Sequence, residues 1–418
     1  MFLELWKKEC GQVAKSLIYW LYVIVLAVFF VSQLGSLKSH MLKEPKKGQD
    51  SYAEYGTMQS NDEREIMRTA LSSLAQGIWY EDFTTYPVGF VKHITLSEEE
   101  MDEIEGILLE TTGMSRDAAG EDIARHFQEN NPENSYVPYV AEPKEGLAYE
   151  DFLRKMERVS EILGPGSDFT EERMKASAKL PMDYEGAMEA YRDLVEKDGY
   201  TGGYLRLFCD YMGIILGILP VFVAATRILR DKRAQMQDLI FARKASSFAI
   251  ITSRYAAMLC MMMAPVMVLS LAPVVECVTF TKGSKIALDY LAFLKYDLGW
   301  LLPTVMVVTA LGLFLTEITE SALAVLVQGI WWFAAISLGV DKLHGGQYGW
   351  NLIPRHNTEI NYSGFANGYT QLVYNRIFYV ILAIALTAVT ILIYEKKRKG
   401  HLRRRGKILR NYKRTDEA

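Results

Sequence analysis

The chain has 418 residues, too many for one ordinary domain, and half of them are hydrophobic. Charge is spread unevenly, because the segment 37–203 holds 35 acidic residues against 18 Lys and Arg, whereas the rest of the chain has a basic excess. This pattern excludes a single soluble domain of uniform character. It indicates a water-exposed acidic segment inserted into apolar material with basic flanks.

Six apolar stretches are long enough, or nearly so, to cross a bilayer, which takes about 20 helical residues. They are residues 17–34, 207–226, 255–275, 298–316, 321–340 and 377–394. Each is continuously apolar rather than alternating, which predicts helices and not barrel strands. The predicted fold class is therefore an all-α polytopic membrane protein with six transmembrane helices, and a mostly helical extracellular domain inserted between helices 1 and 2.

Residues 1–36 form a predicted cytoplasmic segment and the first span. The apolar run is longer than the core of a usual signal peptide, and no small-x-small cleavage site follows it, so we expect an uncleaved anchor. The residues before the run suit either a helix lying in the membrane interface or a short basic tail. The apolar residues near one face of that helix are Phe2, Leu5, Trp6 and Val13.

Basic residues predict the orientation, because cytoplasmic loops hold the excess of Lys and Arg. With the N-terminus inside, the cytoplasmic segments hold 20 Lys and Arg and the opposite face holds 6. We therefore expect a multi-pass protein of the cell membrane, with cytoplasmic termini and residues 37–203 extracellular. The basic tail 396–418 is expected to bind anionic lipid. Its membrane tether and lack of interleaved aromatics argue against nucleic acid as a partner.

Local signals predict helices in the segment 37–203. Ser97 with Glu100 three residues later forms a capping box, and the helix that follows should stop at Gly113. Apolar residues at helical spacing predict a second helix that ends at the Gly-Pro-Gly run 164–166. A third is expected over 183–197, and a short hairpin within FTTYPVGFVKHI.

Motifs for catalysis and cofactor binding are missing. There is no GxxxxGK[ST], HExxH or GxSxG sequence, and the four cysteines form no CxxC pair. His93 and His126 are isolated from other ligand types, so we expect no metal site. The acidic runs suit a solvated surface and helix N-termini better than acid–base catalysis. The chain is predicted not to be an enzyme and to hold no cofactor itself.

The predicted cytoplasmic loop 227–247, RILRDKRAQMQDLIFARKASS, is basic and punctuated by apolar residues. Met236, Leu239 and Ile240 fall on one helical face, which predicts a short amphipathic helix held by a cytosolic partner. The alternative is a solvated connector that contacts anionic lipid headgroups.

This layout resembles the ABC-2 type permease family, and the large insertion at 37–203 resembles that of a Firmicutes-type subgroup. The DLIFARKASS run is similar to the family's coupling segment, and YGWNLIPRHN at 348–357 resembles its external re-entrant region, which includes Pro354 and Arg355. The resemblance implies that the loop docks a separate ATPase. The residues it implies for force transfer are Arg233, Met236, Asp238, Leu239, Phe241 and Arg243.

The resemblance covers residues 1–34 and the predicted bundle 204–395, and it further implies the permease subunit of an ATP-driven exporter. Two permease copies or homologues would pair as a homo- or heterodimer, and a cytosolic ABC ATPase would bind the ATP and Mg²⁺. Membrane lipids complete the expected partners. The alternative is a membrane-anchored sensor whose extracellular domain recognises a ligand, while an intramembrane enzyme is disfavoured because the spans show no paired carboxylates or zinc motif.

Two charged residues fall in or near the predicted spans, where ionisable groups often mark transport pathways. Asp210 is close to the outer end of the second span, and Arg254 is close to the cytoplasmic end of the third. Both are candidate intramembrane polar residues. The alternatives are that Asp210 lies in headgroup water and that Arg254 snorkels to the interface.

Overall fold

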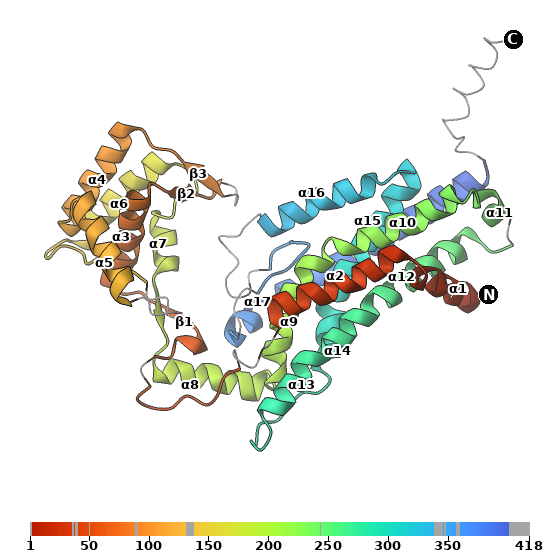
Figure 1. The fold of residues 1–418 in the computed structure, drawn as a ribbon, viewed down its shortest axis with the longest axis horizontal. Helices are drawn as coiled ribbons and strands as arrows, with labels where there is room; N and C mark the ends of the chain where they lie inside the picture. Colours follow the sequence, from red (N-terminus) through yellow and green to blue (C-terminus); the bar gives the residue numbers. More distant parts are fainter. Residues whose placement is uncertain are drawn as a thin grey trace, which may run out of the picture. The chain divides into compact units, whose positions relative to one another are not determined.

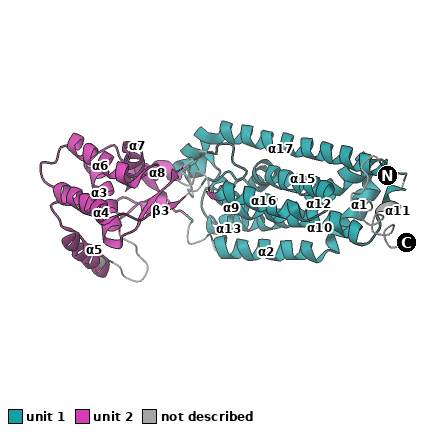
Figure 2. Cartoon of the chain, turned by 90° about the horizontal axis from the view of Figure 1, so that it is seen from above, with its two compact units in different colours: residues 1–41, 192–336, 343–418 teal, residues 42–191, 337–342 magenta. Residues whose placement is uncertain are grey.

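The computed structural model of the chain describes most of its length and is mostly helical. The described residues are 2–35, 37, 41–49, 51–87, 91–130, 138–242, 244–337, 346, 348–356 and 360–400, with backbone only for 130, 237 and 238. Their contacts divide the chain into two compact units, coloured separately in Figure 2. Unit 1 comprises 1–41, 192–336 and 343–418, and unit 2 comprises 42–191 and 337–342. The predicted boundaries 37–203 of an inserted extracellular domain stay a prediction.

Unit 1 contains the apolar helices, and Figure 1 labels its α-helices. Its elements are α1 (Phe2–Ala14), α2 (Leu17–Leu34), the π-helical turn η4 (Asp193–Lys197), α9 (Thr201–Leu216), α10 (Leu219–Arg233), α11 (Gln237–Phe241), α12 (Ser247–Leu269), α13 (Leu271–Phe280), α14 (Ala292–Tyr296), the π-helical turn η5 (Asp297–Leu301), α15 (Leu302–Thr319), α16 (Leu323–Ser337) and α17 (Tyr362–Arg398).

Four helical stretches in the described residues are long and apolar enough to cross a membrane. They are α2, α12 with α13, α14 through α15, and α17. The predicted span 207–226 is instead the pair α9 and α10, bent by 41°. The break precedes Pro220, which cannot donate a backbone hydrogen bond. The predicted span 321–340 corresponds to α16, which has 15 residues. The structure thus supports a helical membrane protein with four spans, or five if the bent pair is one span.

The core of unit 1 lies where α15 packs against α10 and α17. Gly312 on α15 lets α10 approach closely, because a Cβ atom there would lie 2.8 Å from the Cβ of Ala224. Figure 2 shows α17 extending along this unit. The helix starts at Tyr362, well before the predicted residue 377, because Asn361 caps it by accepting from the Gly364 amide.

Unit 2 is a helical domain with its own apolar core. Its elements are the 3₁₀ turn η2 (Ala53–Tyr55), β1 (Thr57–Gln59), α3 (Glu63–Tyr80), β2 (Phe83–Thr85), β3 (Lys92–Ile94), α4 (Glu98–Thr112), α5 (Arg116–Asn130), α6 (Tyr149–Leu163), α7 (Glu171–Ser177), β4 (Lys179–Pro181) and α8 (Tyr184–Arg192), the last ending at the unit boundary. Strands β1 and β4 pair antiparallel, as do β2 and β3. The second pair is the predicted hairpin.

Two predicted helices of unit 2 are confirmed. Helix α4 has the capping box at Ser97 and Glu100, and it ends at Gly113 in the left-handed region with φ of 80°. Helix α6 ends at Gly164 and buries its predicted apolar face. Only the first part of the predicted helix 183–197 is regular, since α8 is followed by the π-helical turn η4.

Replacing Ser97 with alanine should cost about 1 kcal/mol of helix stability, because the cap hydroxyl accepts a hydrogen bond from the Glu100 amide. Amide hydrogen exchange in the first turn of α4 should become faster. Ser97→Thr, which keeps a hydroxyl, is the control and should exchange more like the wild type. Equal exchange in the two variants would contradict the role of the cap.

The second hydrogen bond of this capping box, from the Ser97 amide to the Glu100 carboxylate, should depend on pH. The Ser97 amide donates to the Glu100 carboxylate at 2.8 Å and lowers the pKa of Glu100. A carboxyl with a lowered pKa stabilises the fold above its unfolded-state pKa, and this contribution is lost as the pH falls through the lowered value.

Candidate functional site

The predicted coupling segment lies at one end of unit 1 and has one exposed face and one half-buried face. Helix α11 is short, and it follows Gln235, which turns the chain with φ of 53°. Met236 is 40% exposed and Leu239 is 63% exposed, whereas Ile240 and Phe241 are half-buried. Ile240 therefore does not share the outward face, contrary to the prediction. Consecutive helical residues differ by about 100° in direction, so Ile240 turns inward when Leu239 points out.

The remaining predicted coupling residues differ in what the structure shows of them. Arg233 is exposed at the last turn of α10. Arg243 lies outside the described residues, as does the side chain of Asp238. Three of the six predicted residues thus lie exposed close together along the chain, and Phe241 lies on the inner side.

The inner face of α11 is held by the end of α17. The rings of Phe241 and Tyr394 meet edge to face, with centroids 5.4 Å apart. One turn later, Arg398 donates from Nε to the Phe241 carbonyl at 2.9 Å and from Nη1 to the Ala245 carbonyl at 2.6 Å. A guanidinium on two backbone carbonyls fixes the loop to this helix. A displacement of α11 would therefore act directly on α17.

A buried ring of ion pairs lies beside this joint. We call Glu9, Arg227, Asp231 and Arg254 the four-residue ring. Arg227 donates to Glu9 at 2.7 Å and to Asp231 at 2.8 Å. Arg254 donates to Glu9 at 3.3 Å and to Asp231 at 2.6 Å. The ring connects helices α1, α10 and α12, and the side chains of its two arginines are only 8% and 5% exposed.

Arg254 is paired rather than free at the predicted end of the third span. Its side chain is buried and its guanidinium binds two carboxylates. The partner Glu9 comes from α1, a helix that precedes the first predicted span. Sequence spacing gives no signal for this pairing, because the two residues are far apart in the chain.

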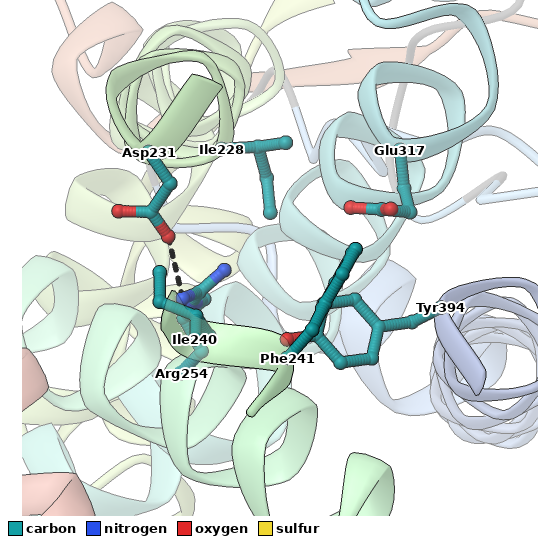
Figure 3. A pocket seen from close by; sticks show the side chains of 7 residues that line it. All are labelled: Ile228, Asp231, Ile240, Phe241, Arg254, Glu317 and Tyr394. Atoms are coloured by element: carbon teal, nitrogen blue, oxygen red, sulfur yellow. Dashed lines mark hydrogen bonds and ion pairs between the residues drawn. The ribbon is translucent and has the colours of Figure 1, made fainter. Parts of the chain in front are cut away.

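The small cavity in Figure 3 lies between the ring and α11. Its volume of about 20 Å³ is room for one water molecule and not for a substrate. The described residues contain no group of His, Cys, Asp and Glu that could hold a metal ion. The lining residues are Ile228, Asp231, Ile240, Phe241, Arg254, Glu317 and Tyr394.

A second ion-pair group connects α10 with α15 and α17 at their ends. Glu320 follows α15 and lies 2.9 Å from Lys232 of α10 and 3.1 Å from Lys397 of α17. Burial would raise the pKa of Glu320, but the two lysines hold it below its usual value. Helices α10, α15 and α17 are thus joined by charge in addition to apolar packing.

Asp210 lies in a different buried site of unit 1, where it binds the predicted re-entrant segment. Arg355 donates to both oxygens of Asp210, at 2.9 Å and 3.2 Å, and the His356 amide donates to it at 2.6 Å. Asp210 is 2% exposed, so it does not lie in headgroup water. Pro354 is buried next to this pair. The structure thus brings Asp210 together with the predicted re-entrant segment, which the sequence analysis named separately.

Two further buried arginines, Arg206 and Arg376, are not among the residues that the sequence analysis predicted. Arg206 is fully buried and donates to Asp198 at 2.5 Å and 2.7 Å, and to the carbonyl of Ile360 at 2.6 Å. Arg376 on α17 donates to the Trp300 carbonyl at 3.0 Å and makes further bonds to neutral oxygens. Arg376 directly precedes the predicted last span 377–394, so the sequence prediction places it outside the membrane. A charge beside a long apolar run was the available signal.

These features define the chain as a helical membrane protein in which buried ion pairs join neighbouring helices. In comparisons with known proteins, no protein-family model, no curated protein and no solved structure matches the chain. The resemblance to ABC-2 permeases therefore depends on the residues quoted above, and what it implies is a proposal.

Proposed function

We propose that the chain is the permease subunit of an ABC-2 type transporter that exports its substrate. A separate cytosolic ATPase would dock on the loop 227–247 and bind the ATP and Mg²⁺. The observation that supports this best is the two-faced α11, with Met236 and Leu239 exposed and Phe241 packed on Tyr394. An outward apolar pair on a segment anchored to a spanning helix suits a helix-in-groove contact.

Force would pass from α11 into the membrane helices by two routes. The first route leads to α17 through the contact of Phe241 with Tyr394 and the hydrogen bond from Arg398 to the Phe241 carbonyl. The second route leads through Asp231, whose ion pairs in the four-residue ring connect it to α1 and α12. Closure of the ATPases would rock these helices as packed bodies, opening a path between two permease copies. In this proposal both termini are cytoplasmic and residues 37–203 are extracellular.

A charged groove favours the alternative function, a membrane-anchored sensor. Helices α4 and α6 of unit 2 line a groove of about 680 Å³. Arg158 donates to Glu103 across it at 2.6 Å, and Lys155 pairs with Glu110. A sensor would bind its ligand on unit 2 and tolerate a scrambled 227–247 loop. A transport subunit would lose its ATPase when that loop is scrambled.

Replacing Met236 and Leu239 with glutamate should abolish recovery of the ATPase when the chain is purified from mild detergent, because two charges would enter an apolar contact. The measurement is the amount of co-purified protein that carries a P-loop and binds ATP. We expect a near-stoichiometric amount with the wild type and at least a tenfold loss with the variant. A tenfold loss of affinity corresponds to about 1.4 kcal/mol of binding free energy.

The matched control is Leu109→Glu, at a leucine of α4 in unit 2 that is 49% exposed. It adds charge at an exposed helical position and should leave ATPase recovery unchanged. Equal recovery from all three chains, or no ATPase with the wild type, would reject docking through α11 and favour the sensor.

A further inference from the structure

Asp297 is a buried acid that the coupling proposal does not use. It begins the π-helical turn η5, within the apolar stretch Ala292–Thr319, and is 0% exposed. One carboxyl oxygen lies 2.6 Å from the hydroxyl of Ser270. The other, Oδ1, has no hydrogen-bond partner among the described residues. Single π-helical turns in longer helices often mark functional positions.

Asp297 differs from the other buried aspartates of unit 1 in its surroundings. Asp210 is paired with Arg355, and Asp198 is paired with Arg206. Asp297 makes no ion pair with any Lys, Arg or His that the structure describes. An ionised carboxylate that is fully buried and has one oxygen without a donor is strongly disfavoured in an apolar interior.

The hydrogen bonds of Ser270 accommodate a proton on Asp297. Its Oγ is 2.6 Å from Asp297 Oδ2 and 3.0 Å from the carbonyl oxygen of Met267. A serine hydroxyl has one hydrogen to donate, whereas an ionised carboxylate and a carbonyl can only accept. If Asp297 is protonated, it can donate to Ser270 while Ser270 donates to Met267, so that each contact has its own hydrogen. The 2.6 Å distance suits either charge state, so the argument for a proton depends on the burial of Asp297 and on Oδ1, which has no partner among the described residues.

We propose that Asp297 is a proton-binding site in the membrane part of the chain, neutral in this conformation. Its carboxyl group takes one proton from solvent and returns it there, with no other bond made or broken. Ser270 lies at the break between α12 and α13, where it ends the first helix and precedes the second. Proton binding at Asp297 would therefore stabilise this break, and ionisation would loosen it.

The titratable groups near this site in the described residues come from neighbouring helices. Helix α9 contributes the thiol of Cys209, and the neighbouring Asp210 is engaged by Arg355. Tyr296 on α14 interacts with Arg206 instead. From α13, Glu276 accepts a hydrogen bond from the Leu37 amide. None of these groups supplies a positive charge paired with Asp297, so a proton is the ligand that the site would take.

The test is infrared spectroscopy of the full chain in lipid nanodiscs at neutral pH. A protonated carboxylic acid has a carbonyl stretch in a region where ionised carboxylates do not absorb. We expect one such band in the wild type, shifted in heavy water and lost completely in Asp297→Asn. Asp210→Asn is the matched control, because that aspartate is paired with an arginine, and it should leave the band intact. Ser270→Ala should move the band without removing it.

The wild type alone also tests the proposal if a variant fails to fold. Isotopically labelled aspartate should shift the band, and raising the pH should remove it. Absence of an aspartate band at neutral pH, or its persistence in Asp297→Asn, would show that Asp297 is ionised and overturn the proposal. The test does not require an ATPase, so its outcome is independent of the proposed transport function.

Discussion

Replacing Arg254 with methionine should destabilise the folded chain by about 3–5 kcal/mol, the range expected when one partner of a buried ion pair is removed. The guanidinium is 5% exposed and serves both carboxylates of the four-residue ring. Without it, Glu9 and Asp231 would share only Arg227, and one buried negative charge would lose its compensation. The measurement is the free energy of unfolding in detergent, followed through the loss of helical circular dichroism.

Two variants separate charge from geometry at this position. Arg254→Lys keeps the positive charge but loses the planar fork that binds both carboxylates, so we expect an intermediate loss of stability. Combining Glu9→Gln with Arg254→Gln should cost less than the sum of the single changes, because both charges of one pair leave together. Additive losses would contradict a direct interaction between α1 and α12 through these side chains.

Replacing Arg355 with alanine should have a similar effect, also about 3–5 kcal/mol, in the second buried site. Asp210 is 2% exposed and would lose both hydrogen bonds that the Arg355 guanidinium donates to it. We expect a lower free energy of unfolding and, with Asp210→Asn in a double-mutant cycle, a coupling of about 0.5–3 kcal/mol. A coupling near zero would show that the pair does not hold the segment 348–356.

An exposed ion pair provides the control for this prediction. Arg64 is 68% exposed and lies 3.2 Å from Glu142 in unit 2. Water screens such a pair and solvates either side chain when the other is removed. Arg64→Ala should therefore change the stability by only about 0–1 kcal/mol. An equal effect of the two arginine variants would mean that burial does not decide the strength of these pairs.

Sequence signals that act within a few turns of chain predicted their elements well. The capping box at Ser97 places the start of α4, and the glycine at 164 ends α6. Four of the predicted spans correspond to helices of sufficient length and apolarity, because an uninterrupted apolar run is a local property. The same reasoning placed α17 too late, since its first turns are polar and depend on a cap at Asn361.

The candidate site was only partly predictable, because several of its contacts join helices that are distant in the sequence. Apolar spacing and charge around 231–247 predicted a short amphipathic helix, yet the inward turn of Ile240 and the anchor at Arg398 depend on α17 lying beside it. The proton site at Asp297 depends on a hydroxyl from another helix. Neither contact can be predicted from the spacing of residue types along the chain, because each joins residues that are far apart in the sequence.

The amino-acid sequence by itself determined that this chain has long apolar helices, an acidic segment between the first two of them, and a basic amphipathic loop. These properties follow from composition and period along the chain. Only the tertiary structure decided that Arg254 binds Glu9, that Arg355 binds Asp210, and that Asp297 has no basic partner in the part of the chain described. A buried charge needs a counter-charge or a proton, and which it receives depends on which helices become neighbours.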